Sequence, residues 1–165
     1  MNNVQFEVDI DQVMKMFSEF DAKQRKKVYR SAVSKGLNIV KKQTISNLQS
    51  VINPQKINEK DKWGNSFKSG IVTKVYRSAK SGVIHIMKNF KMKFFELGTD
   101  VRYAKTWNGR KLKKTRYTGS IKAHGFFTKA KQQTESTVFS SIEKLLVDAI
   151  NKINNKYKGK KWQLQ

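Results

Sequence analysis

The chain has 165 residues, with 35 Lys and Arg against 12 Asp and Glu, so its formal charge is +23. It contains no cysteine, which excludes a disulfide framework and a thiolate zinc site. The length favours one domain, no apolar run approaches the ~18 residues of a membrane span, and the first residues do not form a signal peptide.

Two helices are expected in the N-terminal third. Residues 10–20 have the spacing of a short amphipathic helix. A longer helix begins after Asp21, because Gln24 three residues on completes a capping box. It ends before Asn53-Pro54, since the residue before proline avoids the helical region. Its apolar face repeats at helical spacing through Tyr29, Val33, Leu37, Val40, Thr44, Leu48 and Ile52.

The middle of the chain predicts strands. Residues 55–66 are polar and form a loop, and residues 67–77 and 82–90 alternate as two strands joined by a turn. A third strand is expected over residues 91–97, ending at Gly98. Residues 100–122 have glycines and little periodicity, which predicts a long exposed loop or an irregular hairpin.

The last helix has the clearest pattern, and Thr128 or Thr134 is its expected cap. The order of elements predicts an α+β fold, with a long N-terminal helix and a C-terminal helix packed on a small antiparallel sheet. Residues 1–157 form a single domain on this interpretation, and residues 158–165 form a basic tail. The helix has an apolar stripe of Val138, Ile142, Leu145, Leu146, Ala149, Ile150, Ile153 and Tyr157.

Three strings give a family resemblance. They are Phe95-Glu96-Leu97-Gly98-Thr99, residues 123–130 directly before the last helix, and, more loosely, residues 63–71. In this order they resemble the tail-completion (neck) family of tailed bacteriophages, also called head–tail joining or minor tail proteins. That family has a long N-terminal helix, a small sheet, a Glu-x-Gly-Thr turn, a Pro-Phe-x-x-x-Ala segment and a C-terminal helix.

The match covers roughly residues 20–157 and has departures. Gly125 stands where proline is usual, and Lys91-Met92 replace the usual Tyr-Ala. Residues 100–122 are longer and more basic than the family norm. These departures leave a neighbouring role open, such as tail terminator or head-closure adaptor.

The resemblance implies a structural virion protein. It would form a homo-oligomeric ring, a hexamer or dodecamer, in the neck of the particle after assembly in the host cytoplasm. Its partners would be a portal-side adaptor or head-closure protein on one side and a tail terminator or tail-tube protein on the other. DNA passes through such a ring, and no membrane is involved.

The motif residues have both functional and ordinary interpretations. Gly98 permits a turn, while Glu96 and Thr99 hydrogen-bond across it or to a neighbouring subunit. The alternative is an ordinary turn with a solvated glutamate. The two phenylalanines before the last helix are expected to anchor it by burial. The candidate turn and interface residues are Glu96, Gly98, Thr99, Phe126, Phe127 and Ala130.

Charge is unevenly placed along the chain. Five of the twelve acidic residues lie in the first 21, whereas residues 101–134 have none and contain ten Lys or Arg. Cations with interleaved Tyr103, Trp107 and Tyr117 suit nucleic acid, but a solvated loop or a protein-docking arm fits as well. We favour the docking arm, because a cationic channel lining would retard DNA. The candidate basic residues are Arg102, Lys105, Arg110, Lys111, Lys113, Lys114, Arg116 and Lys122.

Catalysis is not expected. The sequence has no P-loop, no dinucleotide fingerprint, no H-E-x-x-H and no Gly-x-Ser-x-Gly elbow. His85 and His124 are far apart and have no carboxylates at metal-binding or catalytic spacing. We therefore expect no enzyme activity, no cofactor and no metal. The rival to the virion protein is a basic nucleic-acid-binding module that contacts DNA through residues 101–122.

Overall fold

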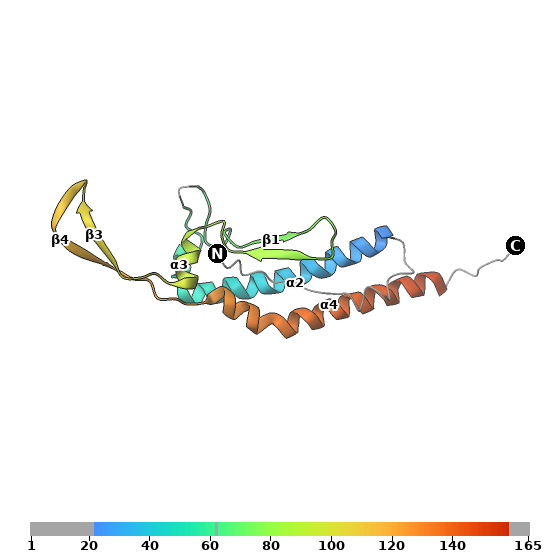
Figure 1. Cartoon of the computed structure of the whole chain (residues 1–165). Coiled ribbons are helices and arrows are strands. Elements are labelled where there is room, and N and C mark those ends of the chain that lie inside the picture. The colour runs from blue at the N-terminus through green and yellow to red at the C-terminus, as the bar shows by residue number, and fades with distance from the viewer. Residues whose placement is uncertain (1–21, 62, 159–165) are drawn as a thin grey trace. The chain divides into compact units, whose positions relative to one another are not determined.

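The structure, a computed structural model, describes residues 22–61 and 63–158 (Figure 1). The predicted helix over residues 10–20, the Asp21 cap and residues 159–165 of the tail lie outside this range. Two long helices and two antiparallel two-stranded sheets give the α+β fold that was predicted. The elements are α2 (Ala22–Val51), the short 3-10 helix η1 (Pro54–Lys56), β1 (Val72–Val75), β2 (Gly82–His85), α3 (Lys91–Leu97), β3 (Arg102–Trp107), β4 (Arg110–Gly119) and α4 (Phe126–Lys158).

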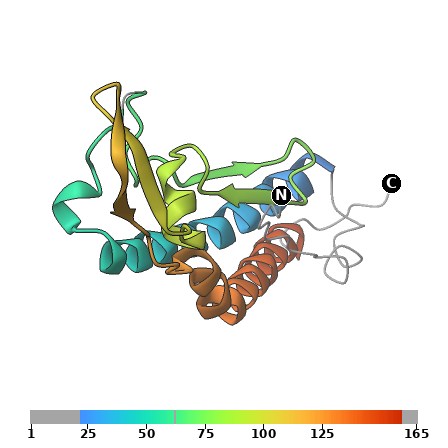
Figure 2. The same ribbon diagram turned by 60° about the vertical axis from the view of Figure 1, so that its left-hand side comes forward.

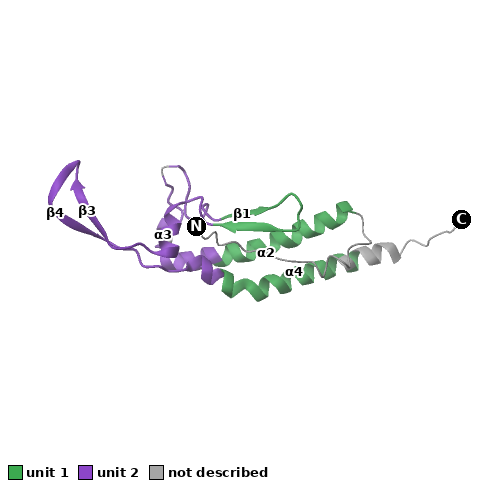
Figure 3. Ribbon diagram, in the orientation of Figure 1, with its two compact units in different colours: residues 1–43, 72–85, 131–165 green, residues 44–71, 86–130 purple. Residues whose placement is uncertain are grey.

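The chain divides into two compact units, shown in Figure 3. Unit 1 contains the described residues of 1–43, 72–85 and 131–165, and unit 2 contains residues 44–71 and 86–130. Both long helices contribute to both units. The last turns of α2 and the first turn of α4 belong to unit 2, and the rest of each helix belongs to unit 1.

In unit 1, α2 and α4 lie side by side and antiparallel (Figures 1 and 2). Gly36 marks their close approach, because a Cβ there would lie 3.0 Å from Ile142 Cδ1 and 3.1 Å from Val138 Cγ1. The Gln43 side chain donates a hydrogen bond of 3.2 Å to the side chain of Gln133. The glycine thus lets the two helices bury their apolar stripes against each other.

The predicted apolar face of the N-terminal helix is confirmed. All seven of its positions are buried, and on α4 Val138, Ile142 and Leu146 are buried as well. Burial also raises the pKa of the Tyr29 hydroxyl, an effect that the nearby Arg25 guanidinium partly offsets. The helix ends at Val51, close to the predicted stop before Pro54.

The first sheet is a hairpin of β1 and β2 that packs on α2 in unit 1. Val72 pairs with His85, and Val75 pairs with Gly82. Both strands are shorter than predicted, because hydrogen-bonded turns occupy the flanking residues. Before β1, the Gly70 N–H donates to the Ser66 carbonyl at 2.9 Å, and after it the Tyr76 N–H donates to the Ser81 carbonyl at 3.0 Å.

The predicted strand over residues 91–97 is wrong, since these residues form helix α3. The Lys91 N–H donates to Asn89 Oδ1 at 3.1 Å, and the Met92 N–H donates to the Asn89 carbonyl at 3.1 Å. This Asn-led turn starts the helix. Met92 and Glu96, four residues apart, then become its buried face. The alternation of Met92 and Phe94 imitated a strand.

Gly82 provides a test of the packing in unit 1. A Cβ at this position would lie 2.8 Å from the Lys74 carbonyl oxygen and 2.8 Å from Leu37 Cδ1. Because the carbonyl belongs to the paired strand, Gly82→Ala is expected to lower the free energy of unfolding by about 1–3 kcal/mol. Chemical denaturation measures this change. The exposed neighbour Lys80→Ala is the control, and equal midpoints for the two variants would contradict the described packing.

Candidate functional site

Two of the strings that carry the family resemblance contact each other in unit 2. The Glu96 carboxylate accepts a hydrogen bond from the Phe127 N–H through Oε2, at 2.8 Å. Its Oε1 accepts from the Thr128 N–H at 3.0 Å and from the Thr128 hydroxyl at 2.7 Å. We call residues 95–99 and 121–128 together the clasp.

The Glu96 carboxylate caps α4. The Gly125 carbonyl accepts the first intrahelical bond, from the Lys129 N–H at 2.9 Å, so Gly125 occupies the N-cap position. Glycine has no side chain with which to satisfy the next amides. Glu96 supplies the acceptor instead, and its negative charge also suits the N-terminal end of the helix dipole.

Neither predicted threonine is the cap of this helix. Thr128 donates to Glu96 from within the first turn, and Thr134 lies further along α4, where its hydroxyl donates to the Lys131 carbonyl. Glu96 is only 6% exposed, so the interpretation as a solvated glutamate is also wrong. Its partners are two amides and one hydroxyl of its own chain.

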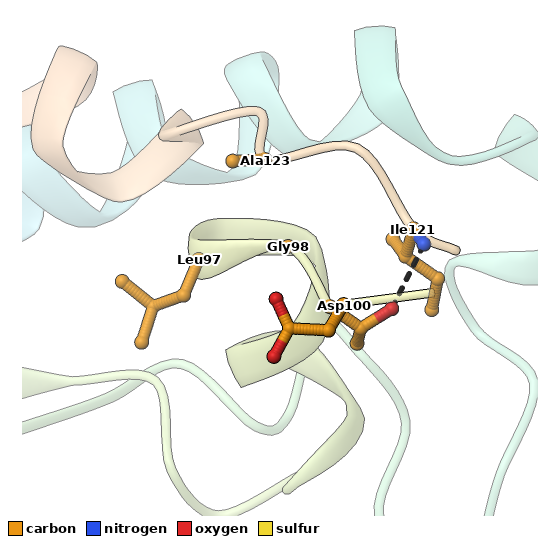
Figure 4. Close-up of a pocket in the computed structure, with 6 residues that line it drawn as sticks. Leu97, Gly98, Asp100, Ile121 and Ala123 are labelled. Atoms are coloured by element: carbon orange, nitrogen blue, oxygen red, sulfur yellow. Dashed lines mark hydrogen bonds between the residues drawn. The ribbon is translucent and has the colours of Figure 1, made fainter. Parts of the chain in front are cut away.

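Main-chain bonds extend the clasp in both directions. The His124 N–H donates to the Phe95 carbonyl at 2.9 Å, and the Gly125 N–H donates to the Glu96 carbonyl at 3.1 Å. At the other end, the Thr99 N–H donates to the Ile121 carbonyl at 2.8 Å. The Ile121 N–H returns a bond to Thr99 Oγ1 at 2.9 Å, drawn as the dashed line in Figure 4. Thr99 therefore hydrogen-bonds within its own chain. A bond within the chain and a bond to a neighbouring subunit were the two predicted alternatives.

Gly98 is required by the clasp. Its φ of 75° is in the left-handed region. A Cβ would lie 2.8 Å from the Ala123 nitrogen and 2.9 Å from the Ile121 oxygen, both backbone atoms. A side chain here would therefore push the two halves of the clasp apart.

The phenylalanine prediction is consistent with the burial in unit 2. Phe126, Phe127 and Ala130 are all buried, and the Asn47 side chain donates to the Phe126 carbonyl at 3.1 Å. An open hollow of about 460 Å³ lies beside the clasp (Figure 4). Asp100 is the only acidic or basic residue lining it, so the hollow has no acid–base pair. Its lining residues are Leu97, Gly98, Thr99, Asp100, Ile121 and Ala123.

The basic stretch is a hairpin, so the irregular hairpin was the correct alternative and the long loop was wrong. Strands β3 and β4 pair antiparallel, with Tyr103 opposite Tyr117 and Trp107 opposite Arg110. The register shifts twice, between Arg102 and Tyr103 and between Ala104 and Thr106. Such irregularities hid the strand alternation in the sequence.

The sequence contains a local signal for this hairpin, the pair Asn108-Gly109. Asn108 and Gly109 form the turn, with φ values of 48° and 77°. Two central residues with positive φ are typical of the tight turns that Asn-Gly favours. The clasp closes the other end of the hairpin through the bonds between Thr99 and Ile121.

All eight candidate basic residues are exposed, and seven of them lie on the hairpin. Lys122 follows β4, on the way to α4. Three rings lie among the hairpin cations: Tyr103, Trp107 and Tyr117 are 59%, 57% and 60% exposed. The tyrosine rings meet edge to face at 5.9 Å, and the Arg116 guanidinium lies 5.0 Å from the centre of the Trp107 ring.

A second exposed feature of unit 2 was missed. Trp63 meets Phe90 edge to face at 5.6 Å, and Phe90 meets Phe94 in the same way at 6.1 Å. All three rings are exposed, as is Leu97 one turn further along α3. We call these four residues the aromatic face. The spacing of residues 90, 94 and 97 would have indicated one helical face, but the strand interpretation concealed it.

Comparison with known proteins gives no relative: no protein-family model, curated protein or solved structure matches the chain. Over residues 22–61 and 63–158, no helix combines the length and apolar character needed to cross a membrane. The same residues contain no group of three or more His, Asp or Glu that could hold a metal ion.

The clasp can be tested at Glu96. Replacing it with alanine removes the acceptor for two amide N–H groups, one of them buried, so Glu96→Ala is expected to cost about 2 kcal/mol of unfolding free energy. Glu96→Gln should cost less, because the amide oxygen still accepts. Denaturant titration measures both variants against Glu135→Ala, which removes an exposed glutamate from α4. A Glu96→Ala protein as stable as that control would rule out the capping role.

Proposed function

We propose that this chain is a structural subunit of the neck of a tailed bacteriophage, which assembles as a closed ring joining the head connector to the tail. The observation that carries the proposal is the clasp. The two best strings of the resemblance are separate in the sequence, and they are hydrogen-bonded to each other through Glu96, Gly125 and Thr128. Unrelated chance matches have no reason to meet in one structural unit.

The function requires binding surfaces and no reaction chemistry. A ring subunit must contact its own copies and the layers above and below it. The clasp supports the proposal because it holds an exposed hairpin on a hydrogen-bonded base, and ordered projecting segments bind with a lower entropic cost than free loops.

The aromatic face is the surface that we assign to contact between neighbouring copies. Connected exposed rings of this kind are typical of interaction sites, and aromatic residues are enriched at the centres of interfaces. The exposed side chains of Lys88, Lys91 and Lys93 flank it in the sequence. Copies with a charge of +23 repel each other, so contact needs local complementarity.

The acidic start of the chain offers that complementarity. Residues 1–21 contain five acidic residues and one lysine, whereas the rest of the chain is strongly basic. We therefore assign the first 21 residues of one copy to the aromatic face of the next. A head-to-tail contact between two different surfaces generates a ring when its rotation closes.

The proposal predicts a discrete oligomer. Light scattering on the full chain should give one mass that is a multiple of the protomer's. The double variant Phe90→Ser, Phe94→Ser should dissociate to monomer at a protein concentration about tenfold higher than the concentration at which the unaltered protein dissociates, because the contact loses two rings.

The matched control is Phe139→Ser with Val147→Ser, which changes two exposed apolar residues of α4 in unit 1. This control should keep the oligomer. A protein that is strictly monomeric, and that also fails to form a ring with portal-side or tail-side partners, would overturn the proposed function.

A further inference from the structure

The β3–β4 hairpin carries charge that it cannot neutralise itself. Its two strands contain seven Lys or Arg, all exposed, and no acidic residue occurs between residues 101 and 134. Like charges along a two-stranded ribbon repel, and an isolated hairpin is marginally stable in water. The hairpin therefore favours a polyanionic partner, whose charge would remove this repulsion.

The distribution of its residues favours phosphate over an acidic protein. Protein interfaces have an apolar centre depleted of charge. The hairpin has no centre depleted of charge, because its exposed rings Tyr103, Trp107 and Tyr117 lie among seven exposed cations spread over both strands. Cations spread in this way suit repeated contacts to a phosphate backbone.

The shape of the hairpin favours a duplex. In the described structure, β3 and β4 pair only with each other, so the hairpin is a two-stranded ribbon. The ten residues of β4 extend ~33 Å at ~3.3 Å each. The major groove of B-DNA, about 12 Å wide, admits a two-stranded ribbon of this kind.

The rings have contacts within the hairpin, which leave fewer ring faces free for unpaired bases. Stacking of unpaired bases needs free ring faces. Here Tyr103 and Tyr117 pack edge to face across the strands, and the Arg116 guanidinium covers one face of Trp107. The tyrosine pair stiffens the ribbon, and the Trp107 ring positions the Arg116 guanidinium.

We propose that the β3–β4 hairpin binds double-stranded DNA independently of sequence, lying in a groove with its lysines and arginines on the phosphates. The clasp fixes the base of the ribbon to unit 2 through the paired bonds of Thr99 and Ile121. Phosphate contacts of this kind let a protein slide along DNA, so they are compatible with DNA that moves through a ring. The hairpin and the aromatic face use different residues, so this inference and the proposed function can fail separately.

The experiment measures fluorescence anisotropy of a labelled duplex of about 30 base pairs and arbitrary sequence, titrated with the full chain between about 50 and 200 mM salt. The unaltered protein should bind with an affinity that falls steeply with salt. The test variant is Lys111→Gln, Lys113→Gln, Lys114→Gln and Arg116→Gln. Its log–log salt slope should be shallower by about 0.9 for each phosphate that the variant no longer neutralises.

The matched control is Lys23→Gln, Lys26→Gln, Lys27→Gln and Arg30→Gln. Like the test variant, it removes three lysines and one arginine, here from the exposed surface of α2. It should retain the slope and bind within about threefold of the unaltered protein. Circular dichroism should show the same helix content in both variants as in the unaltered protein, and light scattering should give the same mass, because every altered residue is exposed and lies outside the aromatic face.

The inference is overturned if the protein does not bind the duplex at about 50 mM salt, or if the hairpin variant and its control lose equal affinity. It is also overturned if the protein binds a single strand of the same length more tightly than the duplex. A fourth contrary result is that it binds a polyglutamate peptide of matched charge as tightly as the duplex. The last would make the hairpin a docking arm for acidic protein. Weaker DNA binding with an unchanged oligomer mass would support the inference independently of the ring.

Discussion

The hydrogen bonds that the buried Glu96 carboxylate accepts at the N-terminus of α4 are the interaction on which the rest of unit 2 depends. The two carboxylate oxygens accept hydrogen bonds from the amides of Phe127 and Thr128, which have no carbonyl partner in the first turn of a helix. The same interaction brings the end of α3 against the segment that follows β4, and Gly98 is needed for the close approach of the two backbones. One buried side chain thus sets the start of a long helix and the base of the hairpin, so a change at Glu96 is expected to affect both.

This arrangement accounts for how a chain with a charge of +23 can keep a dense run of cations in an ordered form. The repulsion within the hairpin works against its two strands, while the Asn108-Gly109 turn and the clasp hold its two ends. The cations remain exposed, and residues 101–134 contain no acidic residue, which favours a phosphate backbone as partner. The aromatic face is a second exposed surface, apolar in character, to which we assign contact between copies. A subunit that joins its own copies through one surface and contacts DNA through another would suit a ring through which DNA passes.

The sequence was informative wherever local periodicity decides the structure. The seven buried positions of the N-terminal helical pattern, the end of α2 before Pro54 and the burial of Val138, Ile142 and Leu146 on α4 followed from spacing alone. Residues 91–97 imitate a strand because Met92 and Phe94 alternate, whereas the turn at Asn89 starts a helix. The cap of α4 lay beyond local reasoning, since Glu96 is 31 residues from Phe127 in sequence and only the fold brings them together. With α3 interpreted as a strand, the aromatic face was not recognised, because Leu97 shares a side with Phe90 and Phe94 only on a helix, and Trp63 is distant in sequence.

Amide hydrogen exchange at Phe127 and Thr128 tests the central interaction most directly. These amides lie in the first turn of α4, where exchange is normally fast unless a cap protects them. The capping role of Glu96 predicts that both exchange as slowly as amides in the middle of α4, and that Glu96→Ala makes them exchange at least about tenfold faster while the hairpin turn at Asn108 is unaffected. If both amides in the unaltered protein exchange as fast as those of the hairpin turn, the clasp does not form and the account built on it fails.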